Sequence, residues 1–321
     1  MPDEERPAPH GSIALGAGGE FDLVRAMVSR WGALSRGIGD DAAILDLLPG
    51  ERLVVSTDSS VENVHFRRNW LSLPEIGYRS VTAALSDLAA MAARPLGIMI
   101  GLVLPDAWID AIPELADGIG DAARTHDTPI VGGDITRGAT FMMSVTVVGA
   151  AERPARRDAV AAGDIVYVTG VLGGPATALR ALQAGREPDS VHRGRFARPR
   201  ARIRESLALA RQGATAMIDV SDGLASELAH LAVASGVELR IDASRIPILR
   251  GCTLEDAARG GEEYELVVVS PHELDADAFA REFALPLSEI GRARRAEQPG
   301  VRATLDGAIV DLGVGHDHFS R

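Results

Sequence analysis

The sequence predicts a chain of two domains, the second of which is a layered α/β domain. Its 321 residues are enough for about two domains of ordinary size. Hydrophobic residues make up 46% of the chain and charged residues 24%, a balance typical of a globular protein with a full core. Residues 151–163 are polar and contain Pro154 and paired arginines, so we place the domain boundary there. We expect a disordered Pro- and Gly-rich lead-in over residues 1–19, the first domain over 20–150 and the second over 151–321.

The first half combines helices with short apolar strands. Apolar residues at helical spacing predict helices over residues 21–31, 74–93 and 107–125. Apolar runs bounded by turn residues predict strands over 42–47, 53–57, 96–104 and 140–149, with a further strand ending at Val131. Pro49-Gly50 predicts the turn between the first two strands.

The second half alternates between strands and helices, which predicts an α/β layer. Strands are expected over residues 165–169, 215–219, 237–242, 264–269 and 287–291. Helices are expected over residues 174–184, 199–211, 223–235 and 273–283. Residues 186–200 carry His192 and several arginines, and we expect them to form an exposed loop.

Composition excludes several classes of function. The net charge of −12 argues against nucleic acid as the main partner. All 33 basic residues are arginine, which removes any P-loop or Schiff-base lysine, so ATP would have to be held by metal ions and arginine. Cys252 is the only cysteine, which fits a reducing cytoplasm. No apolar run approaches the roughly 20 residues that span a bilayer, and no signal peptide is recognisable, so we expect no membrane partner.

Five short motifs place aspartates mostly among small residues, where a ligand can approach backbone and side chain together. They are Gly37-Ile-Gly-Asp-Asp41, Ser56-Thr-Asp-Ser-Ser60, Leu85-Ser-Asp-Leu88, Gly132-Gly-Asp134 and Asp219-Val-Ser-Asp-Gly223. Oxygen ligands without histidine or cysteine partners suit Mg²⁺. The motifs therefore indicate Mg²⁺-dependent phosphate chemistry.

Each motif has a simpler structural alternative. Ser221 or Asp222 could be a helix N-cap, which would not explain Asp219 at a strand end, where ligands bind in α/β sheets. Asp87 lies beside the apolar face of a helix and would be costly to bury without a cation or a donor. Taken alone, Gly37-Ile-Gly-Asp-Asp41 is best interpreted as a turn. Gly132-Gly-Asp134 is equally compatible with a plain turn, and Ser56-Thr-Asp58 with a simple cap.

One further motif contains glutamates rather than aspartates. Gly260-Gly-Glu-Glu-Tyr-Glu265 precedes a strong apolar run, and its three glutamates are compatible with a solvated strand entrance. The double glycine also suggests that one carboxylate faces a ligand at close range.

Taken together and in this order, the motifs resemble the thiamine-monophosphate kinases, within the superfamily that includes aminoimidazole ribonucleotide synthetase. The resemblance extends from Gly19-Glu-Phe21 to His318-Phe319. It implies transfer of the γ-phosphoryl group of ATP to thiamine monophosphate, giving thiamine diphosphate, by a cytoplasmic homodimer that binds several Mg²⁺ ions. It also implies an N-terminal α+β domain whose sheet pairs across the dimer, followed by a C-terminal layered α/β domain.

The resemblance implies roles for particular residues. The metal ligands would be Asp41, Ser56, Thr57, Asp58, Asp87, Asp134, Asp219 and Asp222. ATP would contact His126, Gly133, Asp134, Arg157 and Ser221. The thiamine substrate would contact His65, Glu262 and His316, where His316 stands in place of the family's usual Tyr or Trp.

The implied chemistry needs no general acid or base. A phosphomonoester has a second pKa of about 6, so the acceptor is already mostly dianionic at neutral pH. Metal ions would then reduce the repulsion between two anions and align an in-line transfer.

Two alternatives remain open. One is another ATP-dependent reaction of the same superfamily, although selenophosphate synthesis normally needs a cysteine near the N-terminus and Cys252 is far from it. The other is a nucleotide-binding scaffold with an inactive site, which the intact carboxylates of all five motifs disfavour.

Overall fold

The computed structural model describes Leu15 and residues 18–316, and it divides into two compact units. Unit 1 runs to Ala84 and resumes over Pro95–Ala150, whereas unit 2 comprises Leu85–Arg94 and the residues from Ala151 onward. The expected lead-in over residues 1–19 lies almost entirely outside the described residues. The predicted first domain included the whole helix around residues 74–93, but the end of this helix groups with unit 2.

Unit 1 is built on a four-stranded sheet with the order β1-β4-β2-β3. The strands are β1 (Arg52–Val61), β2 (Arg94–Leu104), β3 (Ile130–Arg137) and β4 (Met142–Ala151). Strands β2 and β3 are parallel, with Ile100 opposite Gly133 and Gly101 opposite Asp134. In this order β1 and β3 are the two edges of the sheet.

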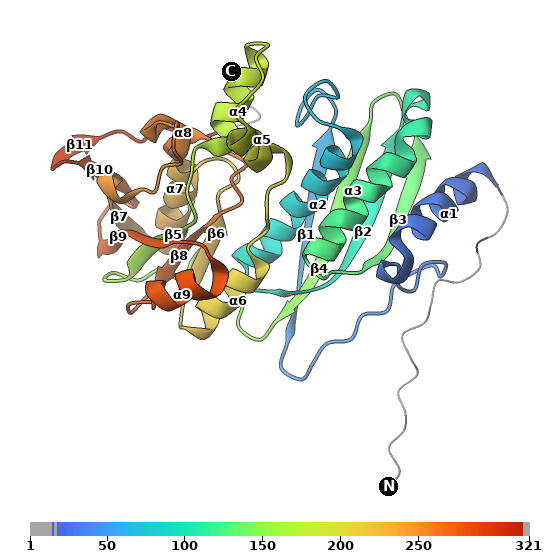
Figure 1. Cartoon of the computed structure of the whole chain (residues 1–321). Helices are drawn as coiled ribbons and strands as arrows, with labels where there is room; N and C mark the ends of the chain where they lie inside the picture. The colour runs from blue at the N-terminus through green and yellow to red at the C-terminus, as the bar shows by residue number, and fades with distance from the viewer. Residues whose placement is uncertain (1–14, 16–17, 317–321) are drawn as a thin grey trace, which may run out of the picture. The chain divides into compact units, whose positions relative to one another are not determined.

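Helices α2 (Leu73–Ala90) and α3 (Ile112–Thr125) lie across one face of this sheet (Figure 1). Helix α1 (Gly19–Trp31) packs against α3, and the Trp31 indole N–H donates to the Ala116 carbonyl at 2.9 Å. Two short 3₁₀ segments, η1 (Gly32–Leu34) and η2 (Asp106–Ala111), complete the unit. Trp108 of η2 stacks on Phe141, with the ring centroids 3.8 Å apart, and both rings are buried.

Unit 2 is built on a seven-stranded sheet with the order β11-β10-β7-β9-β5-β8-β6. The strands are β5 (Ile165–Thr169), β6 (Ala216–Asp219), β7 (Val237–Asp242), β8 (Leu266–Ser270), β9 (Leu287–Arg295), β10 (Gly300–Leu305) and β11 (Ala308–Val310). Strands β7 and β10 are parallel, and the other neighbours are antiparallel. The inner strands β5 and β8 and the edge strand β6 are buried along their whole length.

The helices of unit 2 flank this sheet. They are α4 (Gly174–Gln183), α5 (Ser190–Ala197), α6 (Ile203–Arg211), α7 (Leu224–Ser235), α8 (Leu254–Arg259) and α9 (Ala276–Phe283), with the 3₁₀ segment η3 (Ala243–Arg245). Helix α7 packs against β7 and β10, and its Leu224, Leu228 and Leu231 belong to the main core. This core continues through the inward residues of the strands, such as Val166, Ile218 and Val267.

The predicted fold class, an α+β domain followed by a layered α/β domain, is confirmed, and the longest predicted elements are present. Three local predictions are wrong. Residues 42–47 form no strand, and Ile44 is 89% exposed. Gly132, Gly133 and Asp134 lie inside β3 rather than in a turn after it. Residues 186–200 are not an exposed loop, because they contain α5 with His192, Phe196 and Ala197 buried.

The described residues contain no helix with the length and apolar character needed to cross a membrane.

Candidate functional site

The 219–223 loop lies at the C-terminal end of β6, immediately before α7. Asp219 is buried at the end of the strand and accepts a hydrogen bond from the Ser86 hydroxyl at 2.7 Å. Burial and the neighbouring Asp87 carboxylate raise the pKa of Asp219 to about 7. Asp87 and Asp219, which are far apart in the sequence, are therefore close electrostatic neighbours within unit 2.

A second buried carboxylate, Glu227, lies beside Asp222. Its Oε1 atom accepts the Asp222 N–H at 3.1 Å and lies 3.5 Å from the Ser221 hydroxyl. Burial and the Asp222 charge raise the pKa of Glu227 to about 7, whereas Arg157 acts in the opposite direction. The alternative that Ser221 or Asp222 caps α7 does not hold, because the N-cap position is Gly223 and no side chain caps the helix.

The 260–265 loop is bound to the 219–223 loop through main-chain hydrogen bonds. The Glu262 N–H donates to the Ser221 carbonyl at 2.7 Å, and the Tyr264 N–H donates to the Val220 carbonyl at 3.0 Å. The two loops approach so closely that a Cβ atom on Gly261 would lie 2.3 Å from the Ser221 carbonyl oxygen. This contact explains one glycine of the double-glycine motif by packing alone.

The last described residues also reach the 219–223 loop. The His316 N–H donates to the Asp222 carbonyl at 2.8 Å, and the Gly315 N–H donates to the Ser226 hydroxyl at 2.9 Å. Unit 2 therefore gathers seven residues that the resemblance implies: Asp87, Arg157, Asp219, Ser221, Asp222, Glu262 and His316.

The implied residues of unit 1 are more widely spread. Ser56, Thr57 and Asp58 lie in the middle of β1 rather than at its end, since the strand continues to Val61. The Thr57 hydroxyl lies 3.1 Å from the Thr146 hydroxyl on β4. Asp134 is exposed on β3. Because β4 and β2 separate these two edge strands, Asp58 and Asp134 are at least roughly 14 Å apart across the sheet.

The three other implied residues of unit 1 that carry side chains lie outside the sheet. Asp41 is exposed in the segment between η1 and β1. The His65 Nδ1 atom accepts the Val61 N–H at 3.1 Å, which places the proton of a neutral His65 ring on Nε2. His126 follows α3, and its own N–H donates to the Ala122 carbonyl at 3.1 Å.

The donor chemistry of unit 2 fits a hard cation. The side chains of Asp87, Asp219 and Asp222 offer only oxygen, and the first two raise each other's cost of ionisation, which a bound cation would offset. In the part of the chain that the structure describes, no three acidic, histidine or cysteine side chains form a ready metal-binding group. A Mg²⁺ ion held here would thus need ligands from its phosphate substrates or from water as well.

Sequence reasoning missed Glu227 and Ser86, which contact the predicted residues directly. A signal for Glu227 was present, because it follows Leu224 by three residues and precedes Leu228 and Leu231 on the apolar face of one helix. A charged residue at a core position of a helix needs a partner or a ligand. Ser86 gave no comparable signal.

The fold and this site define the class of protein. The chain belongs to the AIR synthase related proteins: the N-terminal domain model of that family matches residues 39–151 and the C-terminal domain model matches residues 161–303. Within this class, it is a member of the thiamine-monophosphate kinase family. The thiamine-monophosphate kinase of Salmonella typhimurium (strain LT2) is 34% identical over 94% of this chain and 98% of that protein.

Solved structures agree with this placement. The crystal structure of thiamine-monophosphate kinase from Stenotrophomonas maltophilia K279a is 36% identical, with a TM-score of 0.79 over 89% of this chain and 97% of that one. The structure of AaThiL complexed with AMPPCP and TMP is 28% identical, with a TM-score of 0.74 over 93% of this chain and 96% of that one.

Proposed function

We propose that this protein transfers the γ-phosphoryl group of ATP directly to the phosphate of thiamine monophosphate, giving thiamine diphosphate. The observation that carries the proposal is the gathering of Asp87, Asp219 and Asp222 with Glu262 and His316 around one loop of unit 2. Carboxylates that we propose for a metal–phosphate group and residues that we propose for an organic substrate therefore belong to segments that are bonded to one loop. The relative AaThiL, which forms a complex with AMPPCP and TMP, supports both substrates.

The reaction we propose uses positioning and charge rather than proton transfer. The acceptor phosphate is mostly dianionic at neutral pH, so it needs no general base. Bound Mg²⁺ would supply charge neutralisation between the two phosphates. Asp219 and Asp222 would hold it, with Asp87 beside them, and the charge of Arg157 acts on the neighbouring Glu227. Ser221 would contact ATP from the same loop.

The thiamine moiety would lie against Glu262 and His316. The backbone N–H groups of Glu262 and His316 donate to the carbonyls of Ser221 and Asp222, respectively. The proposed substrate contacts and metal ligands would therefore be positioned by the same 219–223 loop. A carboxylate at Glu262 can accept hydrogen bonds from the aminopyrimidine, and the imidazole ring of His316 can stack on a flat heterocycle.

For unit 1 we propose the roles that the resemblance implies. Asp41, Ser56, Thr57, Asp58 and Asp134 would bind metal ions, His126 and Gly133 would contact ATP, and His65 would contact thiamine.

We also propose a cytoplasmic homodimer. Strand β1 is a sheet edge whose Leu53 and Val55 are 54% and 55% exposed, and an exposed apolar edge strand is a pairing surface. A solution mass of one 33.8 kDa chain at working concentration would contradict this proposal.

Product analysis with purified protein tests the activity. Incubation with ATP, Mg²⁺ and thiamine monophosphate should yield thiamine diphosphate and ADP in equal amounts. ADP and free phosphate without thiamine diphosphate would indicate another reaction of the superfamily. ATP binding without turnover would indicate a scaffold.

The Asp222→Asn variant tests the site. It removes a proposed metal ligand while leaving the backbone contacts of the 219–223 loop intact, so kcat should fall at least about a hundredfold with little change in melting temperature. Asp277→Asn, an exposed carboxylate of α9, is the matched control and should retain wild-type turnover. Near-normal turnover of Asp222→Asn would remove Asp222 from the site.

A further inference from the structure

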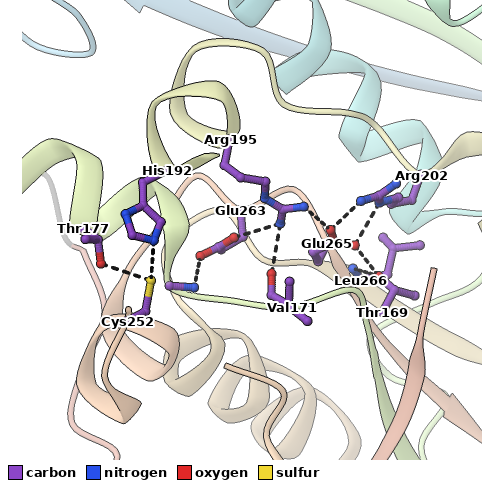
Figure 2. A network of polar contacts seen from close by, with 11 residues as sticks. Thr169, Val171, Thr177, His192, Arg195, Arg202, Cys252, Glu263, Glu265 and Leu266 are labelled. Atoms are coloured by element: carbon purple, nitrogen blue, oxygen red, sulfur yellow. Dashed lines mark hydrogen bonds and ion pairs between the residues drawn. The ribbon is translucent and has the colours of Figure 1, made fainter. Parts of the chain in front are cut away.

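Helix α5 has no role in the site described so far. It begins after Asp189, whose side chain accepts the Val191 N–H at 2.9 Å, and it follows α4 along the chain. Although it was expected to be an exposed loop, it buries His192 and Phe196. Its Arg195 is partly buried, and the guanidinium group points toward Glu263 and Glu265, immediately before β8 (Figure 2).

Arg195 joins two glutamates of the 260–265 loop. The Nη2 atom of Arg195 donates to Glu263 Oε2 at 3.1 Å, and its Nη1 atom donates to Glu265 Oε1 at 3.0 Å. Nη2 also donates to the Val171 carbonyl at 3.1 Å. The forked guanidinium thus connects two residues of the loop to the backbone that follows β5, as Figure 2 shows.

The same two glutamates are held from other sides. Arg202 donates to Glu265 through Nε at 2.8 Å and through Nη2, and the Thr169 hydroxyl donates to Glu265 Oε2 at 2.7 Å. The Gly173 N–H donates to Glu263 Oε1. Both carboxylates are completely buried, so they are positioned to hold the loop rather than to contact a substrate.

Charge compensation explains why this buried group is stable. Burial opposes ionisation of Glu265, but the charges of Arg202 and Arg195 lower the pKa of this carboxyl below its ordinary value. Burial raises the pKa of Glu263 to about 7 against the opposing effect of Arg195. At neutral pH, Glu265 is therefore the ionised partner of the two guanidinium groups, whereas Glu263 is partly protonated. Removing Arg195 or Arg202 would leave the buried Glu265 charge less well compensated.

The loop needs such a hold because its backbone is strained. Glu262 has a φ of 64° and Tyr264 a φ of 53°, both in the left-handed region that residues other than glycine rarely adopt. Glu263, which lies between them, is anchored by Arg195. Glu263 and Glu265 are buried and belong to the network of ion pairs, whereas Glu262, the residue before them, is partly exposed.

Resting on the function proposed above, we propose that Arg195 is a positioning residue, which holds the 260–265 loop in the conformation that presents Glu262 to thiamine monophosphate. Helix α5 thereby acts on the thiamine side of the reaction without touching the substrate. Arg195 has no direct contact with the 219–223 loop, on which the ATP side depends, among the contacts described for this side chain. Its effect on that loop would pass only through main-chain hydrogen bonds such as the one from the Glu262 N–H to the Ser221 carbonyl, so it should be smaller.

The Arg195→Lys variant tests this proposal while keeping the positive charge. A lysine is a single point donor and cannot reproduce the fork to Glu263, Glu265 and Val171. The variant should remain folded, with KM for thiamine monophosphate raised about tenfold and KM for ATP raised much less, because Arg195 reaches the 219–223 loop only through the 260–265 loop. The matched control is Arg204→Lys, an exposed arginine of α6, which should change neither constant.

Amide hydrogen exchange provides a readout that does not depend on activity. The amides of Glu262, Glu263 and Tyr264 are bonded to the carbonyls of Ser221 and Val220, so they report directly on the loop. In Arg195→Lys these amides should exchange faster than in the wild type, whereas amides of the buried strand β5 should not. Unchanged exchange in the loop would overturn the proposal, and so would equal increases in both KM values.

A double variant separates positioning from simple charge balance. Arg195→Met with Glu263→Gln removes both members of a buried pair, so stability should be largely retained. KM for thiamine monophosphate should stay raised, because the loop has still lost its tie to α5. Recovery of the wild-type KM would mean that Arg195 only neutralises Glu263, which contradicts the proposal. If the wild type itself forms no thiamine diphosphate, the proposed function fails, and hydrogen exchange still decides the question of the loop.

Discussion

The two glycines of Gly132-Gly-Asp134 differ sharply although they are adjacent. A Cβ atom added to Gly133 would lie 2.1 Å from the Ile100 carbonyl oxygen on the neighbouring strand β2. A Cβ atom on Gly132 would meet only the Met99 side chain, at 3.8 Å. Strand packing therefore requires the second glycine even without a ligand, whereas the first glycine is not needed for packing.

We expect Gly133→Ala to destabilise unit 1 and Gly132→Ala to leave it nearly unchanged. In Gly133→Ala the backbones of β2 and β3 must separate, which should lower the free energy of unfolding by about 2 to 4 kcal/mol. The Gly132→Ala change should stay within about 1 kcal/mol. Urea unfolding of both variants measures the difference, and equal effects would show that the close approach to Ile100 does not limit this strand.

The position of a residue in the fold was predictable where a local motif encodes it. Asp219 and Asp222 are three positions apart in the sequence, and the expected strand-to-helix transition is found where they stand. The contact of Asp219 with Ser86 joins residues 133 positions apart, and no local pattern encodes such a pair. Glu227 was predictable only in part, because its position on an apolar helix face is the one feature of the sequence that distinguishes it from a surface glutamate.

Length alone did not decide which helices could be predicted. Helices α2 and α7, with 18 and 12 residues, were predicted, whereas α8, with 6 residues, completes too few turns to show an apolar period. Helices α5 and α9 both have 8 residues, and only α9 was predicted, because it is the more strongly amphipathic of the two. Residues 42–47 have the composition of a strand, but Ile44 and Leu47 are exposed and no strand forms. A strand forms in such a segment only if another strand pairs with it, and the composition of the segment does not show whether a partner strand is present.

Helix α8 illustrates how a short helix is stabilised by its ends. Thr253 and Asp256 form a capping box, and Asp256 also binds Arg180 of α4. Burial alone would raise the pKa of Asp256, but hydrogen bonds from Arg180 and Thr253 lower it to about 2. Because the folded-state pKa lies below the ordinary value, the ionised form stabilises the fold above about pH 4, and this contribution is lost as the pH falls toward 2.

We therefore expect Asp256→Asn to lower the free energy of unfolding by about 1 to 2 kcal/mol near neutral pH, since an amide N–H would face Arg180. The difference from the wild type should shrink as the pH falls from about 5 to about 2, where the wild-type carboxyl becomes protonated. Denaturant titrations at several pH values measure it. Glu255→Gln is the control, because Glu255 is 72% exposed and its pair with Arg259 should contribute little at any pH. A difference that does not change with pH would contradict the assignment.

At the scale of the whole molecule, the chain carries a net charge of −12 and buries carboxylates in unit 2 beside one another. Near neutral pH, ionised Asp87 and Asp219 repel, so the site is costly to fold without a cation. A ligand that binds only the folded chain stabilises it by mass action. Stability and substrate binding should therefore be linked through these carboxylates.

We expect Asp219→Asn to have opposite effects on stability with and without ligands. Without ligands the variant should melt at a higher temperature than the wild type at about pH 8, because the repulsion with Asp87 is gone while the amide oxygen can still accept the Ser86 hydroxyl. Mg²⁺ with a non-hydrolysable ATP analogue should raise the melting temperature of the wild type by about 5 °C or more, and that of the variant by much less. Thermal scans at constant ionic strength, with Asp277→Asn as an exposed control, measure both shifts. If the ligand shift were equal in wild type and variant, Asp219 would not be a metal ligand. If the variant melted at a lower temperature than the wild type without ligands, the charge of Asp219 would not destabilise the wild-type fold. The protein itself, rather than a bound cation, would then have to compensate the repulsion between Asp87 and Asp219.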